Sequence, residues 1–419
     1  MRRKNGFKVK RTRKNLYKRR KSTGRKIFEG VLFVIILGAL VFIGYSVASP
    51  LLKFFGGDNQ NSSAVSEPVW VPPESSDDDT SSDGTSTESS PQTTTEKPQD
   101  DPTENKVLYA ALVPDTALQS ESALKKQLTT LKDSGYNTAV FTLKNTTGEL
   151  LYKSTISTVK DNTDVNKGKL TAQQIVNACN DIGLTPIAAI TTLYDRKTPY
   201  LFDNAGYIIS DGNWSWLDAA ADNGGKPWTT PYSKDAVNYY ASICAELAKA
   251  GFTDIELENT IFPNFQSYDY SLLSKDIQSA DRSDKLAALA QACAEKAKTE
   301  NASATVEIKA DELLTMNVST YDGTAEIWSS KDKMKACRVL VTMDISLLGK
   351  NLQTSSDKAT AVNKSAAEGV KQVFTLVKKT VGEAEISAGI TGSSKLSADD
   401  IKKCRDELEK LGFTDIRFE

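Results

Sequence analysis

One short segment near the middle of the chain, residues 251–263, constrains the fold most strongly. It follows a helix-like run, and its apolar and polar residues alternate as they do along a β-strand. Glu256 and Glu258 therefore share one face, whereas Ile255 and Leu257 share the other. A strand that is apolar towards flanking helices and acidic on its other face is typical of a parallel β/α barrel. A solvated strand face, or carboxylates paired with basic neighbours, is the structural alternative.

The N-terminal end predicts a membrane anchor. The first 26 residues carry fourteen Lys or Arg and no Asp or Glu, and residues 30–52 contain no charge. We predict a basic cytoplasmic arm at residues 1–26 and a single transmembrane helix at residues 27–52, with the rest of the chain extracellular. A cleaved signal peptide is the alternative. Because the arm adjoins the span, we expect it to contact anionic lipid of the cell membrane and no nucleic acid.

The next segment is a low-complexity tract. Residues 53–106 are rich in Ser, Thr, Asp, Glu and Pro and poor in apolar residues, so we predict a disordered linker. Outside the basic arm the chain carries 38 basic residues against 54 acidic ones, and much of this excess lies in the linker. An acidic ligand-binding tail is the alternative. Residues 107–419 remain, enough for one large domain.

The absence of histidine narrows the chemistry. A chain with no histidine cannot build a Ser-His-Asp or Cys-His nucleophilic system, or a His-ligated zinc site. The five cysteines are scattered without a CxxC spacing, so we predict no metal site and no cofactor. Acid/base chemistry must then use Asp, Glu, Lys, Tyr or Cys. Paired carboxylates fit this inventory best.

Strand-like and helix-like segments alternate through residues 107–419. The strands are predicted at residues 107–113, 137–144, 185–192, 251–263, 304–309, 337–344, 385–390 and 413–418. The helices are predicted at residues 120–134, 171–182, 234–250, 281–300, 357–381 and 397–411. Eight strands with helical crossovers predict an α/β fold, a (β/α)8 TIM-type barrel, with a doubly wound sheet as the alternative.

Ionisable residues gather near the predicted carboxyl ends of these strands, where barrel sites lie. If the apolar residues face the helices, the polar ones face inward. The candidates are Lys144, Asp195, Glu256, Glu258, Glu307, Lys309, Asp344, Arg417 and Glu419. Either lysine paired with a glutamate would have a purely structural role.

An aromatic loop follows the third predicted strand. It contains Trp214, Trp216 and Trp228, with several tyrosines nearby. Flat aromatic faces at a barrel mouth favour stacking against sugar rings, whereas a small core under a long loop is the alternative.

Four stretches of the domain carry a family resemblance. They read Asn-Thr-Ala-Val-Phe-Thr-Leu-Lys-Asn-Thr-Thr-Gly at residues 137–148, Ile-Ala-Ala-Ile-Thr-Thr-Leu-Tyr-Asp at 187–195, Trp-Thr-Thr-Pro-Tyr at 228–232, and the segment at 251–263. The domain resembles the bacterial "putative glycosyl hydrolase" domain family, an uncharacterised group of TIM barrels similar to α-amylase-type barrels. Other positions depart from the family pattern: its strand-two aspartate falls on Thr142, and two of its arginines fall on Ala189 and Ile261.

The resemblance implies a glycoside hydrolase that uses paired carboxylates. It implies Glu258 as nucleophile, Glu307 as acid/base and Asp344 as helper. We expect Lys144, Asp195, Trp214, Trp216, Trp228, Glu256 and Lys309 to bind substrate. The sequence thus predicts a membrane-anchored extracellular barrel that hydrolyses a cell-envelope or environmental polysaccharide. The departures favour an alternative, a catalytically inactive barrel that binds glycan or acts as an envelope scaffold.

Overall fold

The computed structural model describes residues 107–419, except residues 210–213, 266, 274–276, 278–280, 317–322 and 356–357. The basic arm, the predicted transmembrane helix at residues 27–52 and the linker lie outside the described residues. Among the helices of the described part, none is both long and apolar enough to cross a membrane.

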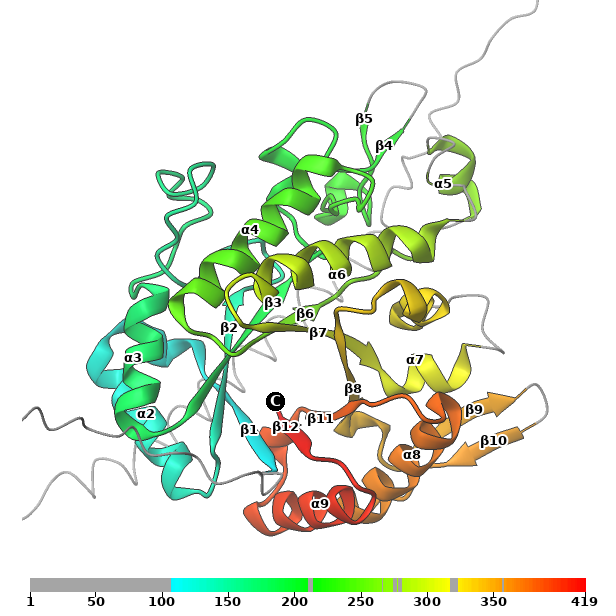
Figure 1. The fold of residues 1–419 in the computed structure, drawn as a ribbon. Coiled ribbons are helices and arrows are strands. Elements are labelled where there is room, and N and C mark those ends of the chain that lie inside the picture. The colour runs from blue at the N-terminus through cyan, green and yellow to red at the C-terminus, as the bar shows by residue number, and fades with distance from the viewer. Residues whose placement is uncertain are drawn as a thin grey trace, which may run out of the picture. The chain divides into compact units, whose positions relative to one another are not determined.

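Eight parallel strands form a closed barrel in chain order (Figure 1). They are β1 (Leu108–Val113), β2 (Thr138–Lys144), β3 (Thr185–Thr191), β6 (Asp254–Glu258), β7 (Ser303–Lys309), β8 (Arg338–Asp344), β11 (Ser387–Thr391) and β12 (Asp415–Phe418). β12 pairs with β1 and closes the ring. The predicted barrel is confirmed, strand by strand, and an open doubly wound sheet is excluded.

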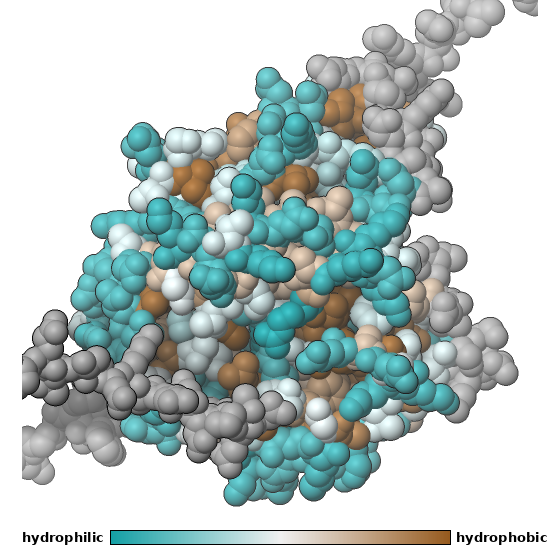
Figure 2. Space-filling view, in the orientation of Figure 1, coloured by the Kyte–Doolittle hydropathy of each residue, from teal (hydrophilic) through white to brown (hydrophobic). Residues whose placement is uncertain are grey.

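Helices cover the outside of the barrel (Figure 1). The long ones are α2 (Glu121–Asp133), α3 (Ala172–Ile182), α4 (Lys234–Ala250), α6 (Arg282–Lys298), α8 (Ala366–Val381) and α9 (Ala398–Lys410). The short ones are α5 (Ser267–Leu272), α7 (Ala310–Thr315), η1 (Asp115–Gln119), η2 (Thr198–Tyr200), η3 (Ala221–Asn223), η4 (Gly323–Lys333), η5 (Ile345–Leu347) and η6 (Ser393–Lys395). The lower edge of the face drawn in Figure 2, over α9, is hydrophilic.

One predicted helix begins later than expected. The prediction placed it at residues 357–381, but α8 begins at Ala366. The chain before it forms an antiparallel hairpin of β9 (Asn351–Ser355) and β10 (Lys358–Ala361). The alternation of polar and apolar residues in Lys-Ala-Thr-Ala suits a strand, and Ser365 occupies the N-cap position where helices commonly begin. A second small hairpin joins β4 (Ile208–Ile209) to β5 (Trp214–Ser215).

Local signals explain where the helices begin and end. Thr171 and Gln174 form a capping box at the start of α3, and Ser233 accepts a hydrogen bond from the backbone at the start of α4. Gly183 and Gly251 end these helices in the left-handed conformation, which glycine adopts without steric cost. Each cap delivers the chain directly into the next strand.

The barrel interior has two unlike halves. The larger apolar core lies between the strands and the helices, and a small separate cluster fills the interior beside β1, β2 and β3. Its members are Ala110, Val140, Ile187 and Ala189. Most interior positions of β6, β7, β8, β11 and β12 carry polar or charged side chains instead, with Leu340 and Gly389 as exceptions. The fold therefore places the candidate site against these five strands.

Candidate active site at the carboxyl ends of the barrel strands

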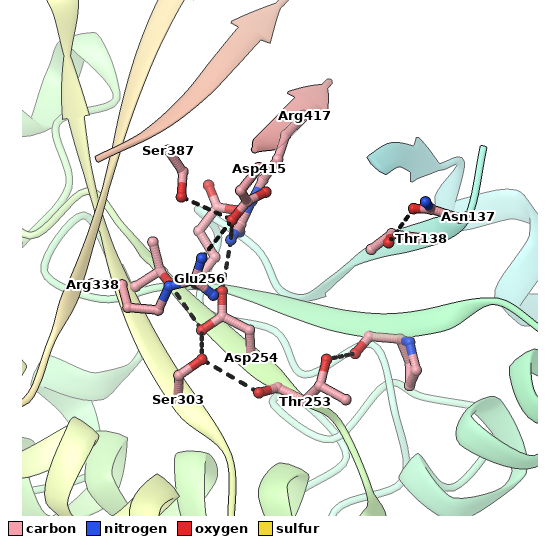
Figure 3. Close-up of polar contacts among 12 residues, drawn as sticks. Asn137, Thr138, Thr253, Asp254, Glu256, Ser303, Arg338, Ser387, Asp415 and Arg417 are labelled. Carbon is pink, nitrogen blue, oxygen red and sulfur yellow. Dashed lines mark hydrogen bonds and ion pairs between the residues drawn. The ribbon is translucent and has the colours of Figure 1, made fainter. Parts of the chain in front are cut away.

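A buried arginine lies at the centre of the polar half (Figure 3). Arg417 on β12 donates from Nη1 to Glu256 Oε2 at 2.9 Å and from Nη2 to Asp254 Oδ2 at 2.7 Å. It also donates twice to Asp415, from Nη2 at 2.9 Å and from Nε at 3.2 Å. These hydrogen bonds cross the barrel from β12 to β6. Charge-assisted bonds of this kind hold their partners in one geometry.

The partners of Arg417 are themselves held by neighbouring strands. Asp254 accepts hydrogen bonds from Thr305 Oγ1 and, at 2.7 Å, from Ser303 Oγ on β7. Asp415 accepts bonds from Ser387 on β11 and Arg338 on β8. Figure 3 shows these groups converging in the barrel. The network is a rigid floor below the carboxyl ends of the strands.

Two glutamates lie above this floor on adjacent strands. Glu256 aligns with Thr305 and Leu257 with Val306, so Glu258 and Glu307 occupy the next level of β6 and β7. Both are partly buried. Because neighbouring strands lie about 4.8 Å apart, two interior side chains at one level are close neighbours. The structure thus brings Glu258 and Glu307, which the sequence predicted as a pair, onto neighbouring strands.

The two glutamates have different hydrogen-bond partners. Thr191 Oγ1 on β3 donates to Glu258 Oε2 at 3.2 Å. Glu307 accepts a 2.9 Å bond from Thr342 Oγ1 on β8 and a further bond from the main-chain N–H of Asn259. Asn259 has a left-handed backbone (φ 53°), a conformation that asparagine tolerates better than most residues. Glu307 therefore has more donors to stabilise its ionised form.

Burial and repulsion shift both pKa values upward. Burial, then the charges of Glu307 and Glu256, raises the pKa of Glu258 to about 8. Burial also raises the pKa of Glu307, while the Thr342 hydroxyl and the charge of Lys309 oppose the shift. Burial raises the pKa of Glu256 to about 7, although Arg417 lowers it. Near neutral pH, Glu258 and Glu307 together retain a proton. The hydrogen bonds favour Glu258 as the residue that carries this proton.

A fourth glutamate joins the cluster. Glu419 directly follows β12, and its main chain bonds to Ile390 and Ser393 at 2.9 Å each. Burial, then the charges of Glu256, Glu258 and Glu307, raises the pKa of its side chain well above the usual range. The alternating pattern predicted that Arg417 and Glu419 face inward but indicated no role for either residue. The signal was their shared alternating position at the end of the last strand.

Lys144 and Asp195 lie elsewhere. The prediction that Lys144 faces inward is wrong, because the register shifts between Thr142 and Lys144. This β-bulge turns the lysine to the outside of the barrel, where it forms a fully buried ion pair with Asp195. Tyr240 of α4 donates to the same carboxylate at 3.0 Å. The pair joins β2, the loop after β3 and α4, and we leave it out of the proposed substrate contacts.

Asp344 and Lys309 lie at the edge of the cluster. Asp344 is exposed, and its carboxylate accepts a 2.6 Å hydrogen bond from the Ser346 main chain. Slight burial raises the pKa of Asp344, but this bond and nearby lysines lower it further, so the net pKa lies below the usual value. Lys309 is partly exposed, 3.9 Å from Glu312, and its charge acts on Glu307.

The three tryptophans have separate environments. Trp216 is 4% exposed and packs against Tyr207 and Phe265, with ring centroids 6.0 and 4.8 Å away. It belongs to the small core that was the structural alternative. Trp228 is half-buried and donates from Nε1 to Asp218 at 3.1 Å. Trp214, by contrast, is 73% exposed, which leaves its ring available for stacking.

Fold and site together define a class, the carboxylate-bearing TIM barrels that resemble glycoside hydrolases. A family model confirms this class: residues 110–321, half of the chain, match the family described as "Putative glycosyl hydrolase domain". The chain belongs to that family.

Solved structures and curated proteins were also compared. The catalytic domain of a β-amylase from Paenibacillus polymyxa is 10% identical to this chain. The alignment covers 75% of this chain and 92% of the β-amylase chain, with a TM-score of 0.46. The glycoside hydrolase domain of PgaB (BpsB) from Bordetella bronchiseptica is 11% identical, with coverages of 75% and 94% and a TM-score of 0.47. A hypothetical protein from Ruminiclostridium thermocellum is 19% identical, with coverages of 48% and 96% and a TM-score of 0.38. No curated protein matches the chain.

Proposed function

We propose that the barrel hydrolyses glycosidic bonds with Glu258 and Glu307 as its reacting carboxyl groups. One observation carries the proposal: the two glutamates occupy one level of adjacent strands at the carboxyl end of the barrel. The site also retains a proton near neutral pH, so one group can act as an acid while the other stays ionised. Membership of the family supports the same chemistry.

The hydrogen bonds favour a division of roles opposite to the one that the family resemblance implies. Glu307, with donors from Thr342 and Asn259, is the better anion. Glu258 is the better proton donor, because its pKa is raised to about 8. In a retaining glycosidase the ionised group attacks the sugar and the protonated one assists the leaving oxygen, with about 5–5.5 Å between them. Adjacent strands favour that short separation.

The proposed substrate is an extracellular polysaccharide of the cell envelope or the environment. The charge-free run at residues 30–52 and the fourteen basic residues before it support an anchor in the cell membrane with the barrel outside. The linker at residues 53–106 would give the barrel reach towards a glycan layer. Trp214, exposed on β5 in the segment that follows β3, would offer a stacking surface for a sugar ring.

Product analysis with two paired variants tests the proposal. Wild-type protein should release shorter sugars from a panel of wall and environmental polysaccharides. Glu258→Gln and Glu307→Gln should each lower the rate by about 10²–10⁴-fold, the usual contribution of an acid/base group. Glu383→Gln, an exposed carboxylate in the turn before β11, is the matched control and should keep the wild-type rate.

The same variants assign the roles. If Glu258 is the proton donor, Glu258→Gln should lose least on substrates whose leaving group needs no protonation, such as dinitrophenyl glycosides. If Glu307 is the nucleophile, Glu307→Gly should recover turnover with added azide, which replaces the missing carboxylate. The reverse pattern would restore the roles implied by the resemblance.

One observation favours the non-enzymatic alternative. Ala189 stands where the resemblance implies an arginine, and it lies in the apolar half of the barrel interior with Val140. That half therefore lacks the charge that the resemblance implies. Glycan binding without turnover, and with equal affinity in Glu258→Gln, would make the chain a glycan-binding scaffold rather than a hydrolase.

A further inference from the structure

Two carboxylate oxygens in the site lack hydrogen-bond partners. Oε1 of Glu256 and Oε1 of Glu419 are buried and bond to no other atom of the described residues. Glu256 is 0% exposed, and its other oxygen already accepts from Arg417. A buried acceptor without a donor destabilises the fold, because it has lost its hydrogen bonds to water. Of the two residues, Glu419 is partly exposed, so a ligand can donate to its carboxyl group.

The same region has more carboxyl groups than cations to pair with them. Arg417 is balanced by Asp254, Glu256 and Asp415, and Arg338 by Asp415. Glu258, Glu307 and Glu419 remain above this floor, and the charge of Lys309 reaches Glu307 from the edge. Burial, and then the charges of the neighbouring glutamates, raise the pKa of Glu419 and of Glu258. A cation bound beside Glu419 would stabilise the ionised form of its carboxyl group.

The chemistry of the site limits which kind of cation can bind there. Within the described residues, no group of three or more acidic or cysteine side chains is placed to hold a metal ion. A sugar hydroxyl would donate one hydrogen bond but bring no charge, and an acetamido group would do the same. A protonated amine supplies up to three donors and a positive charge together. It therefore offers a hydrogen bond to Glu419 and a positive charge to the carboxyl cluster.

We propose that the site selects glycans whose sugar units carry a free, protonated amine, with Glu419 accepting from the ammonium and Glu256 stabilising its charge from below. This inference rests on the proposed function, because it names the substrate class of the same site. Glu419 is the contact residue, since it stays partly exposed whereas Glu256 is fully enclosed. Neutral and N-acetylated glycans would donate a hydrogen bond to Glu419 but would bring no positive charge to the carboxyl cluster.

Calorimetric binding to three matched tetrasaccharides tests this specificity. The full chain carrying Glu258→Gln should bind a β-1,4 glucosamine tetramer at least tenfold more tightly than the N-acetylated tetramer or cellotetraose. Adding Glu419→Gln should reduce that preference to about threefold or less. Glu256→Gln, which keeps an oxygen for Arg417, should reduce it by a smaller factor. Equal affinity for the three sugars, or an undiminished preference in Glu419→Gln with a native circular-dichroism spectrum, would overturn the inference.

Turnover by the wild-type chain separates this inference from the proposed function. Selective binding of the glucosamine tetramer without cleavage would refute hydrolysis and uphold amine recognition. Cleavage of neutral or N-acetylated glycans at equal or higher rates would uphold hydrolysis and refute amine recognition.

Discussion

At the scale of single residues, the energetic cost of burying charge falls on a few side chains. Arg417 and its three carboxylates are shielded from water, whereas Arg338, which bonds to the same Asp415, is 45% exposed. A buried pair gains little over apolar packing, yet removing one partner leaves the others uncompensated. The two arginines should therefore differ greatly in their effect on stability.

We predict that Arg417→Met lowers the free energy of unfolding by about 3–5 kcal/mol, because it leaves three buried carboxylates without the arginine that pairs with them. Arg338→Met, the matched control, should cost about 1 kcal/mol or less, since solvent screens its ion pair. Urea denaturation at pH 7 measures both values. Equal losses for the two variants would contradict the central position of Arg417.

The raised pKa of Glu258 predicts the pH dependence of stability. Its pKa is 4.5 in the unfolded chain and about 8 in the folded one, so the folded state binds more protons between these values. The free energy of unfolding should therefore fall as pH rises through this window. Glu258→Gln removes the titrating group and should exceed wild type by on the order of 2 kcal/mol at pH 8.

Denaturation curves at pH 5 and pH 8 measure that difference. At pH 5 the carboxyl is protonated, so glutamine and wild type should be nearly equal in stability. A wild-type chain that grows more stable from pH 5 to pH 8 relative to Glu258→Gln would show that Glu258 is ionised in the fold.

At the scale of elements, the loops after β2 and β3 depend on one close approach. Gly148 has φ +86°, and a Cβ there would lie 2.2 Å from Asp195 Oδ1 and 2.9 Å from the Lys197 main-chain nitrogen. Gly135 also has φ +86°, but a Cβ there would meet nothing within 4 Å. The two glycines have the same left-handed backbone conformation. They differ only in the space available to a Cβ atom.

We predict that Gly135→Ala costs roughly 1–2 kcal/mol, the penalty for a left-handed residue with a Cβ. Gly148→Ala should cost about 1–3 kcal/mol more, because the Asp195 loop must move. Thermal unfolding of the two variants gives the comparison. Equal melting temperatures would mean that the loop yields without cost and that Asp195 is less fixed than its bonds indicate.

Sequence patterns predicted where the barrel strands lie, but they missed local departures from regular structure. Period-two alternation located all eight barrel strands, and Glu256, Glu258 and Glu307 face inward as the alternation requires. The same rule failed at Lys144, because a β-bulge is set by tertiary packing and leaves no local pattern. The helix predicted at residues 357–381 begins only at Ala366, because pairing with β9 decides the structure of residues 358–361. Trp216 could not be assigned to core or surface before its partners were known.

At the scale of the whole molecule, the barrel gives the site its position and leaves its chemistry open. Many activities occur on such barrels, so the fold alone supports no single reaction. The apolar half beside β1, β2 and β3 and the acidic half beside β6, β7 and β12 create an asymmetric interior. That asymmetry arises from particular side chains. The sequence could predict it only where charged residues occupy the alternating positions that face the barrel interior.

The proposed anchor also belongs to this scale. We predict that the full chain sediments with membranes and that removing residues 1–52 releases it into the soluble fraction, because the charge-free run is lost. Carbonate extraction followed by immunoblotting makes the measurement. Removing residues 2–26 alone is the control and should keep the chain on membranes. Sedimentation that persists without residues 1–52 would place the membrane contact elsewhere.

Product analysis of a glucosamine-containing polysaccharide tests the assignment of Glu258 and Glu307 most directly. Wild type and Glu383→Gln should release oligosaccharides at equal rates, and the newly formed ends should keep the anomeric configuration of the bond that was cleaved. Glu258→Gln and Glu307→Gln should each slow the release by at least about 100-fold while remaining folded. Release at the wild-type rate by either glutamine variant would contradict the assignment of these two glutamates as the reacting pair.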